Sequence, residues 1–180
     1  LYDEDINTST VLPFIKGMAD SYADVEVYHS RFYDKNSFCA AFNAMCKLKH
    51  KNAIVYISAH GFKKDIGGLS LVDALTQVNL ASKLYNITGV QLGSCFVGGE
   101  ITTMEILLED CNLSWCAGYK STSDWLVGTM VDTKIIDSML SSKGLRSKKN
   151  TILIDKFSQA LSVFSLDSLD SMYSKTGKVR

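Results

Sequence analysis

Apolar residues occur along the chain in two patterns, as short continuous runs and as stripes with helical spacing. Continuous runs over 53–59, 87–95 and 113–119 are bounded by glycine and polar residues, which is typical of buried strands. A weaker alternation of apolar and polar residues over 25–29 predicts a short further strand. Because strands and helical stripes alternate along the chain, we expect a mostly parallel sheet with helices on both faces.

Stripes with a period of 3.6 residues predict the helices between these runs. They lie near 10–23, after a cap at Asn36 and Ser37, after a cap at Asn79, near 100–110, near 125–140 and over 153–164 with an extension to 172. Residues 69–78 fit either a small hairpin or the start of a helix, and the polar stretch 141–150 is expected to be a linker.

Length and composition indicate one ordered domain over residues 1–180. The chain has 180 residues, of which 46% are hydrophobic and 21% charged, so it can bury a sizeable core. Few strands are visible for a doubly wound sheet, which suggests an additional edge strand before Leu1. We expect the tail over 174–180 to be frayed.

Charge and cysteine content narrow the range of partners. The formal net charge is zero, so nothing favours binding to nucleic acid or to an anionic membrane surface. No apolar run approaches the roughly 20 residues that a membrane span needs. Five cysteines at irregular spacings argue against a disulfide scaffold and favour a reducing cytoplasm. The three histidines are not grouped like metal ligands, so neither a metal site nor a cofactor is expected.

Residues with catalytic chemistry follow two of the predicted strands. Cys95 ends the 87–95 strand, and His60 directly follows the 53–59 strand. Because open α/β sheets build their sites at the carboxyl ends of strands, Cys95 and His60 can meet there as nucleophile and proton donor. The backbone N–H groups of Gly61 and Cys95 can together stabilise an oxyanion.

The order of residues along the chain excludes other cysteine chemistries. No histidine follows His60, which excludes papain-like enzymes and the glutaminase type, because their histidine lies after the cysteine. A phosphatase loop of the Cys-x5-Arg type needs an arginine at position 101, which is Ile101 here. A histidine at one strand end and a cysteine at the next therefore remain as the pattern to explain.

Three blocks of sequence, over 54–61, 90–95 and 117–125, carry a resemblance to a known family. On these blocks the chain resembles the caspase-like (clan CD) cysteine peptidases, most closely the bacterial CHAT branch related to separase. The resemblance extends over about residues 10–140. It implies a caspase-like α/β/α fold, in which a doubly wound, mostly parallel sheet lies between two layers of helices.

The resemblance also implies an activity, that of a cysteine endopeptidase with Cys95 as nucleophile and His60 as general acid/base. The residues that it implies for substrate binding are Gly93, Ser123, Asp124 and Trp125. Asp124 matches the acid that selects a basic residue before the cut in CHAT and separase relatives, so cleavage after Arg or Lys is implied. True caspases carry Gln-Ala-Cys where this chain has Gly-Ser-Cys over 93–95, so aspartate specificity is not implied.

The biological role rests on the resemblance alone. Stand-alone bacterial relatives act in defence or cell death by activating a partner protein with a single cut. A protein substrate is therefore implied, while a regulatory protein partner and the oligomeric state stay open.

The same residues also have structural interpretations. Asp124 can be a plain N-cap of the helix that follows it, instead of or besides selecting a substrate. Trp125 can pack against the core or line the substrate cleft. Cys95 can be a buried structural thiol. The alternative function is a catalytically silent caspase-like scaffold that binds a partner protein: the retained Cys95 and His60 argue against it, but a blocked cleft is invisible in the sequence. A flavodoxin-like binder of small ligands would need a phosphate loop, which we do not find. The remaining cysteines are expected in the core: Cys39, Cys46, Cys111 and Cys116.

Overall fold

The main sheet of the computed structural model has four strands among the residues that it describes, which are 11–48, 50–109, 111–141, 149–164 and 173–176. Their order in space is β1 (Ala53–Ser58), β5 (Ile87–Gly93), β6 (Trp115–Tyr119) and β7 (Tyr173–Thr176). The first three strands are parallel, and β7 pairs antiparallel with β6. The predicted α/β class and the parallel sheet are therefore confirmed.

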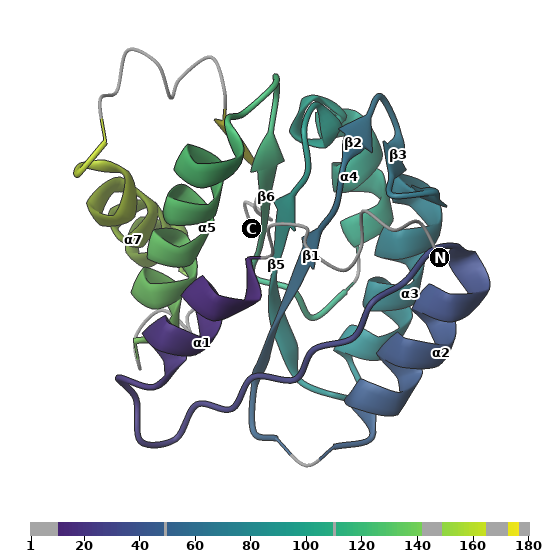
Figure 1. Ribbon diagram of the computed structural model, residues 1–180, viewed down its shortest axis with the longest axis horizontal. Helices are drawn as coiled ribbons and strands as arrows, with labels where there is room; N and C mark the ends of the chain where they lie inside the picture. Colours follow the sequence, from purple (N-terminus) through teal and green to yellow (C-terminus); the bar gives the residue numbers. More distant parts are fainter. Residues whose placement is uncertain (1–10, 49, 110, 142–148, 165–172, 177–180) are drawn as a thin grey trace.

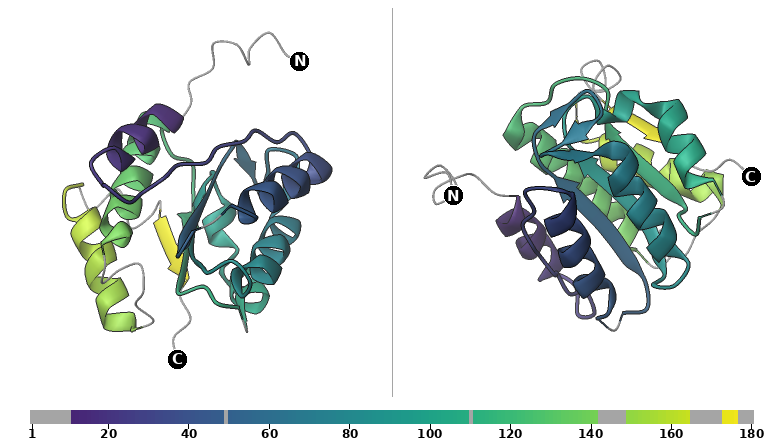
Figure 2. Two further views of the ribbon diagram at one scale, coloured as in Figure 1. Left: turned by 90° about the horizontal axis from the view of Figure 1, so that it is seen from below. Right: turned by 90° about the vertical axis from the view of Figure 1, so that its right-hand side faces the viewer.

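Helices cover both faces of this sheet (Figure 1). In the described part of the chain they are α1 (Leu12–Ala19), α2 (Lys35–Cys46), α3 (Leu71–Ser82), α4 (Ile101–Leu108), α5 (Trp125–Leu140) and α7 (Asn150–Leu161). Figure 2 shows α2, α3 and α4 on one side and α1, α5 and α7 on the other. None of these helices is long and apolar enough to cross a membrane.

Two buried apolar clusters hold the layers together. The larger cluster joins β1 and β5 to α2, α3 and α4, and the smaller one joins β6 to α5 and α7. Alternate residues of β5 face the two sides, as a strand requires. Val90 and Leu92 belong to the larger cluster, whereas Gly89 lies directly against the Trp115 ring of the smaller one.

Side-chain caps explain where three of the helices begin. The Asp34 carboxylate accepts a hydrogen bond from the Ser37 N–H at 2.7 Å, and Ser37 Oγ accepts one from the Asp34 N–H at 3.0 Å. This reciprocal capping box places the N-cap of α2 at Asp34, two positions before the expected Asn36. Ser70 caps α3 by accepting from the Asp73 N–H at 3.0 Å. The third cap, Asp124, starts α5 and belongs to the site described below.

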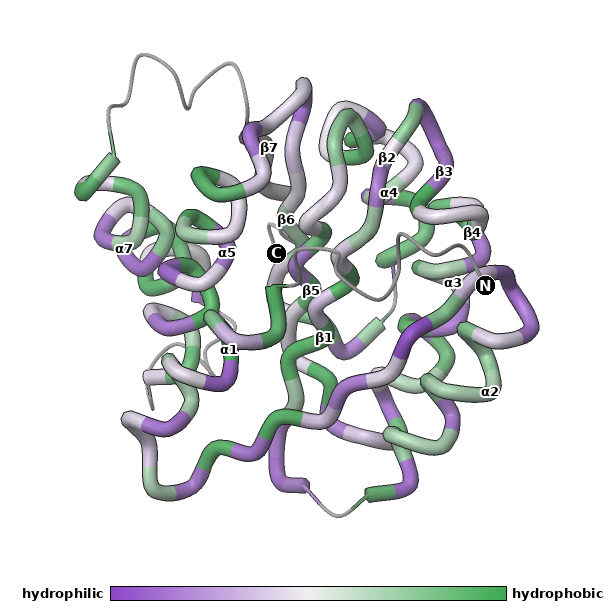
Figure 3. The backbone as a smooth tube through the Cα atoms, viewed as in Figure 1, coloured by the Kyte–Doolittle hydropathy of each residue, from purple (hydrophilic) through white to green (hydrophobic). Residues whose placement is uncertain are grey.

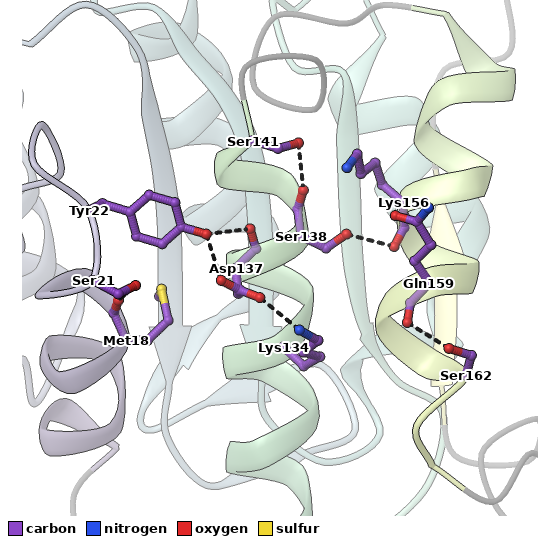
Figure 4. Close-up of polar contacts among 10 residues, drawn as sticks. All are labelled: Met18, Ser21, Tyr22, Lys134, Asp137, Ser138, Ser141, Lys156, Gln159 and Ser162. Atoms are coloured by element: carbon purple, nitrogen blue, oxygen red, sulfur yellow. Dashed lines mark hydrogen bonds and ion pairs between the residues drawn. The ribbon is translucent and has the colours of Figure 1, made fainter.

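Polar contacts join α5 to its neighbours on either side (Figure 4). Tyr22, just after α1, donates to Asp137 Oδ1 at 2.6 Å, and Lys134 Nζ lies 2.9 Å from Oδ2 of the same carboxylate. Ser138 Oγ donates to the Lys156 carbonyl of α7 at 2.9 Å. Burial raises the pKa of Asp137, but the hydrogen bonds from Tyr22 and Lys134 outweigh it and lower the pKa below its ordinary value. The bond to Asp137 raises the pKa of Tyr22 to about 12.

A second, smaller sheet follows β1 directly. It consists of β2 (Gly61–Phe62), β3 (Asp65–Ile66) and β4 (Leu69–Ser70), joined antiparallel. The turn between β2 and β3 is hydrophilic, as Figure 3 shows, whereas Ile66 and Leu69 are buried against the larger cluster. The ambiguous stretch 69–78 is thus a strand, β4, followed at once by α3.

Several predicted elements are wrong. Residues 25–29 form no strand: Val25 and Val27 are half-buried and their neighbours are exposed, but no strand in the described part of the chain pairs with them. Asn79 does not cap a helix, because it lies inside α3 and its side-chain amide donates to the Leu107 carbonyl. Leu80, the next residue of α3, is 65% exposed.

The ends of the sheet also differ from the prediction. Most of β1 is only half-buried, because β1 is the outer strand of the described sheet rather than a central one. Residues 173–176 are not part of a frayed tail but pair with β6 as β7. The predicted helix extension over 165–172, most of the linker and residues 177–180 lie outside the described residues.

Candidate active site

Strands β1 and β5 end side by side. Their last residues, Ser58 and Gly93, are paired in register. His60 and Cys95 each follow two residues later, so both lie at the same edge of the sheet. His60 is exposed and Cys95 is half-buried, so both side chains are accessible from the solvent at this edge.

The chain after His60 passes directly against the Cys95 backbone. A Cβ added at Gly61 would lie 2.2 Å from the Cys95 carbonyl oxygen and 2.8 Å from its nitrogen, so only glycine fits there. Gly67 N–H donates to the His60 carbonyl at 2.9 Å, which makes Gly61 and Ile66 the non-hydrogen-bonded pair of the hairpin. The Gly61 N–H therefore points away from β3. No described residue accepts a hydrogen bond from the Cys95 N–H.

The Cys95 side chain lies against the loop that follows β6. The Ser123 N–H donates to Cys95 Sγ at 3.4 Å, and an N–H directed at sulfur is a suitable partner for a thiolate. The next residue, Phe96, has φ +65° and ψ −20°, a left-handed conformation that is rare for a bulky side chain. Its N–H donates to the Ser121 carbonyl at 3.2 Å. Strained turns of this kind cluster at functional sites.

An ion pair connects the hairpin after His60 to the loop after Cys95. Lys64 Nζ, in the turn between β2 and β3, lies 3.2 Å from Glu100 Oε2, just before α4. The two side chains are 61% and 30% exposed, so the pair contributes no more than about 1 kcal/mol to stability. The pair links the two loops but adds little to the stability of the fold.

Asp124 and Trp125 lie at the start of α5, beside this edge. Asp124 Oδ1 accepts hydrogen bonds from the N–H groups of Leu126 at 3.0 Å and Val127 at 3.2 Å, so the N-cap interpretation is correct. Both cap bonds use the same carboxylate oxygen. Trp125 packs edge-on against Phe14 of α1 with ring centroids 5.9 Å apart, yet it stays 44% exposed.

Comparison of the chain with models of protein families, with curated proteins and with solved structures gave no match. Functional inference therefore rests on the geometry of the side chains and on the sequence blocks that surround them.

A buried carboxyl that the sequence analysis did not single out lies beneath this edge. Asp132 of α5 is 1% exposed. Its Oδ2 accepts a hydrogen bond from Tyr56 of β1 at 2.7 Å, and its Oδ1 accepts one from Gln91 of β5 at 2.6 Å. The Tyr119 hydroxyl of β6 lies 3.0 Å from Oδ1. A Cβ added at Gly93 would lie 2.6 Å from Oδ2, so the strand end that leads to the cysteine rests directly on this carboxyl.

Asp132 has no positively charged partner in the part of the chain that the structure describes. None of the ion pairs among the described residues includes it. Burial raises the pKa of Asp132 to about 7, although the hydrogen bonds from Tyr56, Tyr119 and Gln91 act in the opposite direction. Burial and the neighbouring carboxyl also raise the pKa of Tyr56. Asp132 therefore changes its charge near neutral pH while remaining inside the protein.

A signal for this network is present in the sequence. Asp132 lies at helical spacing from Gly128, Ile135 and Met139, all buried in α5, so a carboxyl occupies a core position of an otherwise apolar stripe. Gln91 likewise interrupts a run of buried strand residues. A buried polar side chain needs a partner, and two such residues on facing elements predict each other.

Proposed function

We propose that this chain is a cysteine endopeptidase of the caspase-like type, with Cys95 as nucleophile and His60 as general acid/base. The observation that carries the proposal is the contact between Gly61 and the Cys95 backbone at the ends of two paired strands. This contact brings the His-Gly and Cys segments to one point, as peptide-bond hydrolysis by this pair requires. The order of the parallel strands, with helices on both faces, is consistent with a caspase-like sheet.

The reaction uses groups that lie at this edge. Cys95 Sγ attacks the carbonyl carbon of the scissile bond, and its proton passes to the His60 ring. The N–H groups of Gly61 and Cys95 donate to the oxyanion. His60 returns the proton to the departing amine as the C–N bond breaks, and water then hydrolyses the thioester and restores the thiol. No hydrogen bond joins the His60 ring to the sulfur among the described residues, and catalytic hydrogen bonds commonly tighten only when substrate is bound.

Asp124 supports a preference for a basic residue before the cut. Its carboxylate is exposed and follows Ser123, whose N–H contacts the sulfur. Because both cap bonds use Oδ1, the other oxygen is available to pair with an Arg or Lys side chain. Trp125, the residue after Asp124, is partly exposed and offers an apolar surface to the substrate chain. The substrate is then a protein segment, and activation of a partner protein in bacterial defence is an extension by resemblance.

Cut-site profiling tests the activity. The full chain is incubated with a peptide library and the products are identified by mass spectrometry. We expect cuts after Arg or Lys that disappear in Cys95→Ala, with a loss of about 10³-fold or more. The matched control is Cys39→Ala, because Cys39 is also a half-buried free thiol but lies on α2. Cuts that persist without the Cys95 sulfur, or that follow only acidic or neutral residues, would contradict the proposal or its substrate preference.

The alternative is a silent scaffold, and labelling separates the two. A cysteine-directed probe such as iodoacetamide should modify Cys95 faster than Cys39, because the Ser123 N–H supports the charged sulfur. A folded chain that cuts nothing in the library and in which Cys95 reacts no faster than Cys39 would favour a protein that only binds a partner.

A further inference from the structure

The Tyr119 hydroxyl connects the buried Asp132 to the start of α5. Tyr119 Oη lies 2.8 Å from the Gly128 carbonyl and 3.0 Å from Asp132 Oδ1. A hydroxyl has one proton, so it can donate to only one of these two oxygens at a time. Which oxygen receives that proton depends on whether Asp132 carries a proton of its own.

The two protonation states of Asp132 give two hydrogen-bond patterns. When Asp132 is neutral, its carboxyl proton can bind Tyr119 Oη, and Tyr119 donates to the Gly128 carbonyl. When Asp132 is ionised, it accepts the Tyr119 proton instead, and the carbonyl loses this donor. An uncompensated charge in the interior draws the nearest donors toward it, which favours this exchange.

Gly128 in turn lies against the residue that contacts the cysteine. A Cβ added at Gly128 would lie 2.8 Å from Ser123 Oγ, and the Gly128 N–H donates to the Asp124 carbonyl at 2.8 Å to close the first turn of α5. The Ser123 N–H then donates to Cys95 Sγ at 3.4 Å. A continuous series of contacts thus runs from the buried carboxyl to the sulfur.

We propose that Asp132 is a positioning residue of the site, which in its neutral form holds Ser123 against Cys95 through Tyr119 and Gly128 and in its ionised form releases it. This inference rests on the proposed function only in taking Cys95 as the reacting group. The group that it assigns this role, Asp132, is buried and lies on α5, apart from the two reacting residues.

The groups that face Asp132 are few. They are Tyr56 from β1 and Tyr119 from β6, both titratable, and the uncharged Gln91 from β5. On the side of the neighbouring helices, the titratable groups interact with Asp137 instead. Tyr22, after α1, donates a hydrogen bond to Asp137, and the charge of Lys156 on α7 lowers its pKa. A pKa of about 7 for Asp132 places the change between its two states near neutral pH.

The rate of alkylation of Cys95 by iodoacetamide tests this inference without any substrate. The rate is measured on the full chain from about pH 6 to about pH 8 by mass spectrometry of the Cys95 peptide, for wild type and for Asp132→Asn. The amide is permanently neutral, so it keeps the sulfur contact at every pH. We expect the ratio of the wild-type rate to the variant rate to fall by about 3-fold or more as the pH rises, because the thiolate loses the Ser123 donor.

Two further variants make the test specific. Tyr119→Phe leaves the buried charge in place but breaks the series of contacts. The ratio of its Cys95 alkylation rate to that of Asp132→Asn should therefore stay constant with pH. Asp137→Asn removes another tyrosine-bound carboxylate of α5 outside the series, and it should keep the wild-type pH dependence. If Asp132→Asn fails to fold by circular dichroism, the wild-type profile is compared with that of Tyr119→Phe, and the same fall in their ratio is required.

The possible results separate this inference from the proposed function. A ratio that is constant or rises with pH, or a fall that persists in Tyr119→Phe, overturns the positioning role alone. If Cys95 is not alkylated at all, the proposed function fails and this inference fails with it. If the ratio falls as expected but no peptide is cut, the positioning role stands and the peptidase does not.

Discussion

Replacing Asp132 by asparagine should change how the stability of the protein depends on pH. Asn has nearly the same size as Asp and cannot ionise, so it imitates the neutral carboxyl among Tyr56, Gln91 and Tyr119. The pKa of Asp132 in the folded chain is about 7, against an ordinary value of 3.8. A carboxyl with a raised pKa binds more protons when the chain is folded than when it is unfolded. The contribution of Asp132 to stability is therefore highest below about pH 4 and falls as the pH rises, until Asp132 is ionised in both states.

The size of the effect follows from the two pKa values of Asp132. Each pH unit between them is worth about 1.4 kcal/mol, so the ionised carboxyl costs about 4 kcal/mol in full, of which about 3 kcal/mol is lost between about pH 5 and about pH 8. Carboxylates with a lowered pKa, such as Asp137, act in the opposite direction, because the stability that they contribute is lost at low pH. These carboxylates are present in both wild type and Asp132→Asn, so their contributions cancel in the difference between the two free energies of unfolding.

Urea unfolding, followed by far-ultraviolet circular dichroism, measures this difference at several pH values. The free energy of unfolding of Asp132→Asn minus that of wild type should rise by about 3 kcal/mol from about pH 5 to about pH 8. Asp137→Asn is the control on the same helix, and its difference from wild type should not rise in this range. If the Asp132→Asn difference is flat with pH, the carboxyl does not titrate near neutrality and the reasoning is refuted.

Substitutions at Gly61, Asp124 and Tyr22 test the construction of the site and the contact between α1 and α5. Gly61→Ala adds a Cβ 2.2 Å from the Cys95 carbonyl oxygen and should abolish peptide cleavage. Its control is Gly17→Ala on α1, where the added Cβ meets nothing within 4 Å and cleavage should be unchanged. Cleavage by Gly61→Ala would mean that the segments after His60 and around Cys95 are not held in contact. Asp124→Asn keeps an N-cap oxygen but loses the charge. Its free energy of unfolding should change by only a few tenths of a kcal/mol, while the preference for Arg or Lys before the cut weakens. Asp124→Ala should in addition lower the free energy of unfolding, measured in urea, by about 1 kcal/mol. Tyr22→Phe removes the hydrogen bond to Asp137 and should lower the free energy of unfolding by about 1 kcal/mol, and an unchanged value would show that the α1 contact is not stabilising.

Elements with a strong local signal could be predicted from the sequence. The stripe over 125–140 coincides with α5, because Asp124 both ends the preceding loop and caps the helix. The apolar runs of β5 and β6 are long, buried on both faces and bounded by turns, so their positions follow from composition alone. The meeting of two strand ends follows from parallel pairing, which places all carboxyl ends at one edge.

Other features could not be predicted, because they depend on partners far away in the sequence. The burial of residues 25–29 does alternate, but none of the described strands pairs with them. Residues 173–176 pair with β6, although their own sequence gives no strand signal. The Asp132 network joins three strands and a helix, and only the complete sheet brings Tyr56 and Gln91 to the same carboxyl.

The pairing of Ser58 with Gly93 also has a consequence for how the protein matures. These residues are far apart in the chain, with the small β2–β4 sheet and α3 between them, and parallel strands separated in this way associate late in folding. A nascent or partly denatured chain therefore carries the cysteine without the histidine segment beside it. The proposed peptidase activity would then require the finished tertiary structure, and a misfolded copy would lack it.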